Sequence, residues 1–224
     1  MNIKAIYTID VGGPLKIIAV IPTFNRPEGL ARAVKSVISQ TRPVDRVVIV
    51  HEEEDSIELP SELSSAHVTS NLRTRSLSGA INHAIDEILV NRIDWGVNSS
   101  ETWLALLDDD DWWENSYLQM CENRGVNGMH QVVCGITRYD TANPEGTRLQ
   151  IPTTLEVNSF LVSNPHIQGS NLFVRLDAFL EAGGFDEALY SCTDRDFCIR
   201  LFERPGHLWA RLNEHLVHHD ARFS

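Results

Sequence analysis

Four consecutive carboxylates are the part of this sequence that most directly suggests chemistry. Residues 104–107 are apolar, Asp108 to Asp111 follow without a break, and Trp112 and Trp113 come next. Adjacent acids repel one another, and a hard divalent cation such as Mg²⁺ or Mn²⁺ relieves that repulsion because it prefers carboxylate oxygens. A cation held by one or two carboxylates keeps positions free for substrate phosphates. The alternative is an acidic loop in which Asp111 caps a following helix, but a cap needs one aspartate and not four.

Composition limits the class of protein and its partners. The chain has 224 residues, 42% of them hydrophobic and 22% charged, with a formal net charge of −12. This is the balance of a soluble globular domain, and the negative charge disfavours nucleic acid and anionic membranes as partners. We find no apolar run long enough to span a membrane and no signal-peptide core before residue 17. Four irregularly spaced cysteines without a CxxC pair are typical of a reducing compartment, so we expect a cytoplasmic protein.

The first half of the chain alternates between predicted strands and helices. Apolar runs predict buried strands, and apolar residues at helical spacing predict helices. The strands are expected at 17–21, 47–50, 67–70 and 103–107, and the helices over 27–38 and 77–88. This βαβ pattern indicates an α/β fold with a largely parallel sheet. Polar clusters follow three of the strands, and ligands bind beyond the carboxyl ends of strands in such sheets. We therefore expect the clusters at 23–26, 51–55 and 108–111 to meet in one crevice.

The second half predicts a more mixed arrangement. Strands are expected at 131–139 and 169–174, a loop or hairpin at 141–150, and helices at 176–181 and from residue 193 onward. Gly183 and Gly184 suit a helix C-cap. After the first strand neither GxGxxG nor GxxxxGK[ST] occurs, which disfavours NAD-type and P-loop binding. A nucleotide would then be held through a metal and side chains.

In their order along the chain, these motifs resemble those of family 2 glycosyltransferases. The resemblance rests on residues 20–27, 36–41, Asn71, Asn82, 107–113, 183–187 and 193–196, and covers about residues 17–204. It implies an α/β, GT-A-type nucleotide-diphospho-sugar transferase fold, in which helices flank a mostly parallel, Rossmann-like central sheet. We interpret residues 1–224 as a single domain, with a nucleotide-binding half at about 17–112 and an acceptor and catalytic half at about 113–224. Whether a further C-terminal segment belongs to the protein stays open.

The resemblance also implies an activity and roles for several aspartates. The reaction would be inverting transfer of a hexosyl or related sugar from a nucleoside-diphosphate sugar to an acceptor hydroxyl, with Mn²⁺ or Mg²⁺ as cofactor. The family's DxD motif falls on residues 108–110, so that Asp110 would coordinate the metal and Asp108 or Asp109 would contact the ribose or a second metal position. Asp111 lies outside this triplet, and we expect it to cap the following helix. Asp194 falls on the family's general base, which deprotonates the acceptor hydroxyl. Its alternatives are a helix N-terminal acid without catalytic role, and Asp196 as the base.

Further residues are assigned by the same match. The residues expected to bind the nucleotide sugar, besides Asp108 and Asp109, are Pro22, Thr23, Asn25, Arg26, Glu52, Arg75, Gly169 and Ser170. Glu52 follows His51 where the family usually has two aspartates, so the donor base stays open among uracil, thymine and guanine. Arg73 is a further candidate for the diphosphate. By analogy with other GT-A enzymes, His218 or His219 would complete the metal shell.

Two other functions are weighed against this interpretation. A nucleotidyltransferase would normally carry a Gly-rich, basic loop after the first strand, and residues 22–27 lack one. A non-catalytic carbohydrate- or nucleotide-binding module is disfavoured because Asp110 and Asp194 are both present. The acceptor, whether saccharide, lipid-linked or a small molecule, and the oligomeric state cannot be derived from the sequence. Trp112 and Trp113 are expected in the core, with sugar stacking as the alternative.

Overall fold

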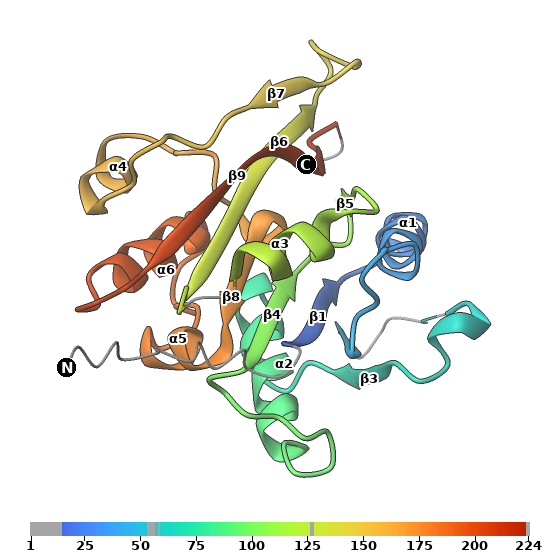
Figure 1. Ribbon diagram of the computed structural model, residues 1–224. Helices are drawn as coiled ribbons and strands as arrows, with labels where there is room; N and C mark the ends of the chain where they lie inside the picture. Colours follow the sequence, from blue (N-terminus) through green and yellow to red (C-terminus); the bar gives the residue numbers. More distant parts are fainter. Residues whose placement is uncertain (1–14, 53–56, 58, 126–127, 223–224) are drawn as a thin grey trace, which may run out of the picture.

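The computed structural model describes residues 15–52, 57, 59–125 and 128–222 (Figure 1). One sheet runs through them, and its first half is parallel. β1 (Lys16–Thr23) lies between β2 (Arg46–His51) and β4 (Thr102–Leu106), and β3 (His67–Ser70) pairs with β2. The predicted βαβ arrangement is therefore confirmed in this half.

The second half of the sheet is mixed, as predicted. β8 (Leu172–Arg175) is antiparallel to both β4 and β6 (Gln131–Tyr139), and β9 (Trp209–Asp220) is parallel to β6. The short β5 (Trp112–Trp113) pairs antiparallel with β9. β7 (Thr147–Leu149) pairs antiparallel with β6. Of the two predicted alternatives for residues 141–150, a loop or a hairpin, the structure therefore shows the hairpin. In Figure 1, β6 and β9 run side by side away from the parallel half.

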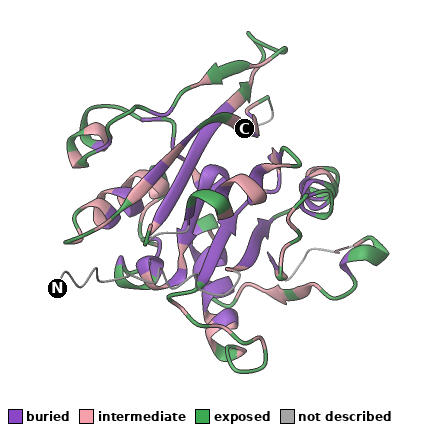
Figure 2. Cartoon of the chain, viewed as in Figure 1, coloured by how far each residue is buried: buried purple, intermediate pink, exposed green. Residues whose placement is uncertain are grey.

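Helices cover both faces of the sheet. Ile17, Ala19 and Ile21 of β1 belong to the core under α1 (Pro27–Ile38) and α3 (Tyr117–Gly125). Ile18 and Val20 face the opposite core. That core lies under α2 (Leu77–Val90), α4 (Val157–Val162), α5 (Leu176–Glu181) and α6 (Thr193–Phe202). Because both faces are covered, the inner strands β1, β2 and β4 are largely apolar, and Figure 2 shows them mostly buried.

Local signals explain where several helices begin and end. α1 starts at Pro27, whose fixed φ and missing N–H suit the first turn. α2 is capped by Ser76, whose hydroxyl accepts from the Gly79 backbone N–H at 3.0 Å. After α5, Gly183 and Gly184 adopt positive φ values of 84° and 69°, which fits the predicted C-cap.

The structure corrects two local predictions. The strand expected from residue 169 begins only at Leu172, because Gly169–Asn171 form the 3-10 helix η2; a second such turn, η1, covers Ser61–Leu63. The prediction of a helix capped by Asp111 is wrong, because β5 follows this residue and α3 begins only at Tyr117. Pairing of β5 with β9 holds this segment extended and turns the Asp111 carboxylate toward the end of β9.

None of the helices in the described ranges is long and apolar enough to cross a membrane. Cys121, Cys134 and Cys198 are buried thiols and Cys192 is an exposed one. The expected cytoplasmic location stays a prediction, as does the division of the chain into a nucleotide half and an acceptor half.

Candidate active site

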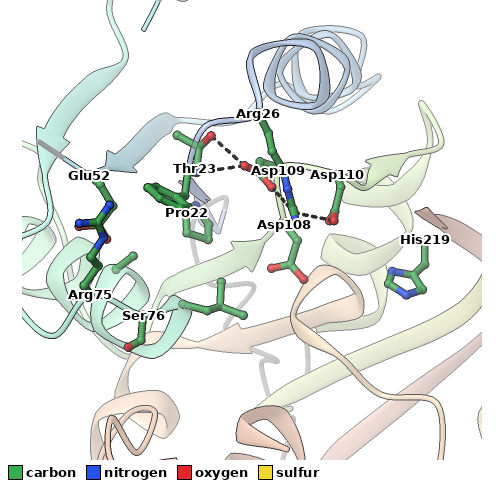
Figure 3. Close-up of a pocket in the computed structure, with 13 residues that line it drawn as sticks. Pro22, Thr23, Arg26, Glu52, Arg75, Ser76, Asp108, Asp109, Asp110 and His219 are labelled. Atoms are coloured by element: carbon green, nitrogen blue, oxygen red, sulfur yellow. Dashed lines mark hydrogen bonds and ion pairs between the residues drawn. The ribbon is translucent and has the colours of Figure 1, made fainter. Parts of the chain in front are cut away.

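A cavity of about 500 Å³ lies at the carboxyl ends of β1, β2 and β4 (Figure 3). The predicted convergence of the strand-end clusters is confirmed for the residues described, because each of the three contributes to the lining. Residues 53–55 of the middle cluster lie outside the described residues. The cavity is lined by Pro22, Thr23, Phe24, Arg26, Glu52, Arg75, Ser76, Leu77, Ala80, Asp108, Asp109, Asp110 and His219.

The two ends of the cavity differ in chemistry. Glu52 and Arg75 lie at one end in Figure 3, and Asp110 and His219 at the other. Glu52 Oε1 accepts from Asn71 Nδ2 at 3.0 Å, and the Arg75 guanidinium lies 4.9 Å from the centre of the Phe24 ring. This end therefore offers a carboxylate, a guanidinium and an aromatic face, whereas the other offers carboxylates and an imidazole.

Asp109 joins the loop after β1 to the loop after β4. Its buried carboxylate accepts from Thr23 Oγ1 at 2.8 Å, from the Phe24 backbone N–H at 3.2 Å and from Arg26 Nη1 at 3.1 Å. A Cβ on Gly29 would lie only 2.6 Å from the Asp109 carbonyl oxygen, so a glycine lets α1 approach this closely. Asp109 thus fixes the wall of the cavity on which Thr23 and Arg26 lie.

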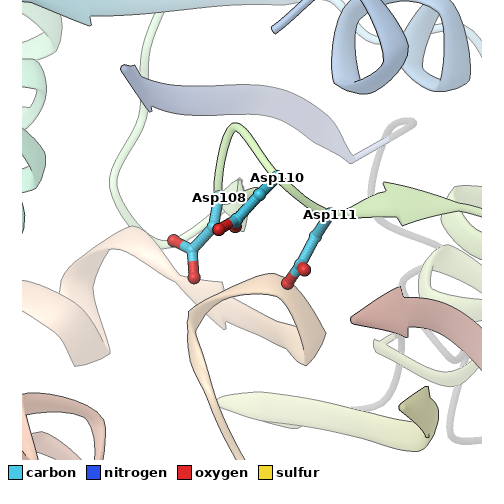
Figure 4. Close-up of side chains that lie close together, drawn as sticks. All are labelled: Asp108, Asp110 and Asp111. Atoms are coloured by element: carbon cyan, nitrogen blue, oxygen red, sulfur yellow. The ribbon is translucent and has the colours of Figure 1, made fainter. Parts of the chain in front are cut away.

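Asp108, Asp110 and Asp111 form what we call the acidic cluster. One carboxylate oxygen from each lies within 4.8 Å of the others, and Figure 4 shows the three side chains on the same side of their loop. Burial raises the pKa of Asp108 well above its usual value, and the charges of Asp111 and Asp194 raise it further. Burial and Asp111 also raise the pKa of Asp110, against the charge of Arg26.

The acidic cluster fits a divalent cation on two grounds. Asp108 Oδ1 is buried and has no hydrogen-bond partner in the described part of the chain. Asp110 Oδ2 pairs at 2.6 Å with Arg26 Nη1, so a positively charged group already lies against this carboxylate. Hard, negatively charged oxygens at this spacing are the donor set that Mg²⁺ and Mn²⁺ prefer. The group is therefore consistent with the predicted metal site.

Asp194 lies beside the acidic cluster, across the backbone of Gly169. A Cβ on Gly169 would be 3.3 Å from Asp108 Oδ1 and 3.7 Å from Asp194 Oδ1, so a glycine leaves both carboxylates room. Asp194 is in the first turn of α6, and burial raises its pKa to about 6. Its Oδ1 is buried without a hydrogen-bond partner among the residues described. Asp196, the alternative base, instead pairs with Arg200 at 2.6 Å.

The two candidate histidines lie on opposite faces of β9. His219 lines the cavity, and its Nδ1 is 3.0 Å from Asp111 Oδ1. Burial lowers the pKa of His219, but the hydrogen bond and charge of Asp111 outweigh the burial and raise it. His218 stacks on Trp112 at 4.9 Å, and its ring nitrogens lie 2.8 Å from Tyr139 Oη and 2.8 Å from Glu114 Oε1. Of the two, the structure brings only His219 to the cluster.

The other predicted residues fall around the cavity or away from it. Ser170 is buried below the acidic loop, where its hydroxyl accepts from the Asp108 backbone N–H at 3.0 Å. Asn25 is exposed with a φ of 52°, next to the lining residues. Arg73 pairs with Asp86 at 2.6 Å and with Glu187 at 2.7 Å, and is not among the lining residues. Trp113 is in the core, as expected.

Sequence reasoning missed several residues of this site. Ser76, Leu77 and Ala80 also line the cavity, and so does Phe24, which lies within the predicted 23–26 cluster but was given no role. Ser76 carried a usable signal, since a serine directly before an apolar helical pattern predicts an N-cap and hence a helix end that faces the crevice. Gln168 and Asp220, which donate hydrogen bonds to Asp111, gave no such signal in the sequence, because only the fold brings them to Asp111.

Comparisons with known proteins agree with this geometry. Residues 18–183 match the family described as Glycosyl transferase family 2. The chain belongs to this family. A Haemophilus influenzae protein described as an uncharacterized glycosyltransferase is 25% identical in an alignment of 209 residues that covers 89% of this chain and 66% of that protein.

Solved glycosyltransferase structures share the fold. S. aureus TarS superimposes with a TM-score of 0.67 at 13% identity, covering 92% of this chain and 37% of TarS. The mannosyltransferase PcManGT from Pyrobaculum calidifontis, solved with GDP-Man and Mn²⁺, gives a TM-score of 0.63 at 13% identity and covers 92% of this chain and 57% of that one. The predicted GT-A fold is confirmed. The family 2 chain spans less than two thirds of the length of these relatives.

Proposed function

We propose that this family 2 glycosyltransferase moves a sugar from a nucleoside-diphosphate sugar to an acceptor hydroxyl, with inversion, with Mn²⁺ or Mg²⁺ at the acidic cluster and with Asp194 as general base. One observation carries the proposal. Asp194 and Asp108 are both partly buried, each has a buried carboxylate oxygen without a hydrogen-bond partner within the described residues, and both adjoin Gly169. A donor-binding group and a proton acceptor are thus adjacent.

The metal site would use Asp108 and Asp110, with His219 on the adjoining strand. When bound, the divalent cation would neutralise the negative charge that develops on the leaving diphosphate. Arg26 lies 2.6 Å from Asp110 and is exposed enough to reach a phosphate as well. The complex of PcManGT with GDP-Man and Mn²⁺ supports a divalent ion as cofactor in this fold.

The opposite end of the cavity would hold the nucleotide base. Glu52 would accept a hydrogen bond from a base N–H, and Phe24 with Arg75 offers a flat surface on which a ring can stack. Pro22 and Thr23 would line the path between base and diphosphate. TarS complexes with UDP and UDP-GlcNAc and the GDP-Man complex of PcManGT support a nucleotide-sugar donor and leave the base open.

Asp194 would accept the proton of the acceptor hydroxyl. As the hydroxyl oxygen forms its bond to the anomeric carbon, the bond to the diphosphate oxygen breaks on the opposite face, and the nucleoside diphosphate leaves. A carboxylate with a pKa of about 6 is ionised at neutral pH and is more basic than an ordinary aspartate, which suits a general base.

The test is release of nucleoside diphosphate from a panel of UDP-, dTDP- and GDP-sugars, each with Mn²⁺, with Mg²⁺ and with EDTA. We expect turnover of at least one donor with metal, and loss of that turnover with EDTA and in Asp110→Asn. The control is Asp94→Asn, which changes an exposed aspartate in the turn after α2. No turnover of any donor would overturn the enzyme proposal in favour of a binding module. Equal turnover in EDTA and in Asp110→Asn would overturn the metal.

A further inference from the structure

Asp111 differs from its neighbours in the acidic cluster because its carboxylate is already fully engaged. It is completely buried, and Oδ1 accepts from His219 Nδ1 at 3.0 Å and from the Asp220 backbone N–H at 3.1 Å. Oδ2 accepts from Gln168 Nε2 at 3.1 Å. Both oxygens therefore have donors directed at them from other segments of the chain.

Asp108 and Asp110 are placed differently. Both line the cavity, whereas Asp111 does not. Asp108 Oδ1 has no hydrogen-bond partner within the described residues, and the Asp110 side chain is 20% exposed. A cation entering from the cavity therefore meets Asp108 and Asp110 first, and reaching Asp111 would require breaking hydrogen bonds that hold β9 and the 168–171 segment.

We propose that Asp111 is a positioning residue and not a ligand. Its contact with His219 Nδ1 keeps the ring proton on that nitrogen, and on a ring that lines the cavity this would leave Nε2 to bind the cation. This inference rests on the proposed metal site. An ionised carboxylate only accepts hydrogen bonds, so contact with it selects the Nδ1–H tautomer and leaves the Nε2 lone pair for a metal. Metal-bound histidines are commonly held by a carboxylate in this way.

A second contact fixes the distance between His219 and the acidic loop. Asp220, next to His219, is completely buried and pairs with Arg32 Nη1 at 3.0 Å. The other terminal nitrogen of Arg32 donates to the Asp110 carbonyl at 2.5 Å. The end of β9 is therefore tied to the acidic loop through Asp111 and through Arg32. A substitution at Asp111 leaves the Arg32 connection in place, which favours folding of the variants below.

The experiment is a double-mutant cycle on Mn²⁺ affinity, measured by electron paramagnetic resonance of free Mn²⁺. The proteins are wild type, Asp111→Ala, His219→Ala and the double variant, with Asp111→Asn as the conservative change and Asp94→Asn as the control. Circular dichroism and Tm confirm that each variant is folded.

We expect Asp111→Ala to weaken Mn²⁺ binding about 10–100-fold, the range for loss of a carboxylate that supports a metal-bound histidine. In the His219→Ala background the same change should have less than about a 3-fold effect, because the ring it positions is gone. Asp111→Asn keeps an oxygen that can accept from Nδ1–H, so it should recover most of the affinity. A direct ligand would behave otherwise: the two effects would add, and Asp111→Asn would bind as weakly as Asp111→Ala. Either result would overturn the proposal.

A second readout needs no metal. Nitrogen-15 NMR of histidine-labelled, metal-free protein at pH 8 should show His219 as the Nδ1–H tautomer in wild type and a shift toward Nε2–H in Asp111→Ala. An Nε2–H tautomer in wild type would overturn the positioning role. If wild type binds no Mn²⁺, the metal site of the proposed function fails and the ligand role of His219 fails with it. If it binds Mn²⁺ with additive effects, only the role of Asp111 fails.

Discussion

Two groups of carboxylates in this molecule differ in how far hydrogen bonds compensate their charge. In the first, Asp108 and Asp194 lie on either side of Gly169, and each has a buried oxygen without a hydrogen-bond partner in the described ranges. Burial raises the pKa of both, for Asp194 to about 6. Unpartnered buried carboxylates destabilise a folded protein.

The second group surrounds Glu187, on the segment that leads from α5 to α6. This carboxylate accepts from Arg73 Nη1 at 2.7 Å, from Asn82 Nδ2 at 2.8 Å, and from the Thr74 hydroxyl at 2.5 Å and backbone N–H at 3.3 Å. Burial raises the pKa of Glu187, but the hydrogen bonds from Asn82, Thr74 and Arg73 outweigh it and lower the pKa to about 2. We call these four residues the Glu187 junction.

This difference separates carboxylates that stabilise the fold from carboxylates that are available for binding and catalysis. The Glu187 junction ties Thr74, one residue before Arg75 of the cavity, to the segment that precedes Asp194. It supplies stabilising hydrogen bonds to the frame of the site. Asp108 and Asp194 each keep a buried oxygen without such compensation in the described part of the chain, and a cation and an acceptor hydroxyl would satisfy these oxygens. Uncompensated carboxylates therefore mark the reactive end of the cavity.

The largest expected effect is loss of transfer in Asp194→Asn. The amide cannot accept the acceptor proton, so kcat should fall about 10³-fold, within the usual contribution of a general base. The KM for the donor should change little, because Asp194 is not among the residues that line the cavity. Initial rates at varied donor concentration measure both quantities.

Asp196→Asn is the matched control for that variant. Asp196 is in the same turn of α6, where it pairs with Arg200, and it is not among the residues that line the cavity. The rate of this variant should stay within about 3-fold of wild type, because an aspartate that is already paired with an arginine has no part in the proposed proton transfer. A variant set in which Asp196→Asn is inactive and Asp194→Asn is active would reverse the assignment of the base.

The second largest expected effect is a change in the free energy of unfolding with pH. Folding raises the pKa of Asp194 from 3.8 to about 6, so the folded state binds more protons between these values than the unfolded state. The stabilisation that the folded state gains from this proton is fully present below pH 3.8 and is lost as pH rises through 6. Relative to Asp194→Asn, metal-free wild type should therefore lose on the order of 2 kcal/mol between pH 4.5 and pH 7.5. Urea unfolding in EDTA at the two pH values measures the difference.

Glu187 should show the opposite sign. Its pKa falls from 4.5 to about 2 on folding, so its stabilisation is present above pH 4.5 and is lost as pH falls toward 2. The stability gap between wild type and Glu187→Gln should thus shrink on acidification. If both variants changed in the same direction with pH, the contrast between the two groups would be wrong.

The smallest effect is on stability at neutral pH. Glu187→Gln replaces charge-assisted hydrogen bonds with weaker ones and leaves one former donor facing an amide N–H, at a cost of roughly 1–2 kcal/mol. Tm should fall by about 2–8 °C for a domain of this size. Asp86→Asn, which contacts only Arg73 of the junction, should lower Tm by less than about 2 °C. Equal losses in the two variants would show that Glu187 has no special part in the frame.

Much of the fold could be predicted because its signals are local. Pro27 begins α1, the apolar runs became strands buried on both faces, and the paired glycines end α5, each for reasons that lie within a few residues. The carboxyl ends of parallel strands must meet at one edge, so the position of the cavity followed from the βαβ order.

The rest depended on contacts between distant segments. Asp111 looked like a helix cap because its partners, Gln168 and Asp220, are 57 and 109 positions away. Arg73 looked like a diphosphate ligand because nothing near it predicts that Glu187 would engage it. Strand alternation put His218 and His219 on different faces, but only the pairing of β5 with β9 determined which face meets the acidic loop.

Metal-dependent nucleotide binding at the acidic cluster is tested most directly by thermal stabilisation with UDP, dTDP and GDP, each with Mn²⁺ or with EDTA, in wild type and Asp110→Asn. A nucleotide at 100 times its Kd adds about 2.7 kcal/mol, which raises Tm by roughly 5–10 °C. We expect such a rise for at least one nucleotide with Mn²⁺, and little or none in EDTA or in Asp110→Asn. Equal stabilisation in all three conditions, or none by any nucleotide, would contradict a metal-dependent nucleotide site at the acidic cluster.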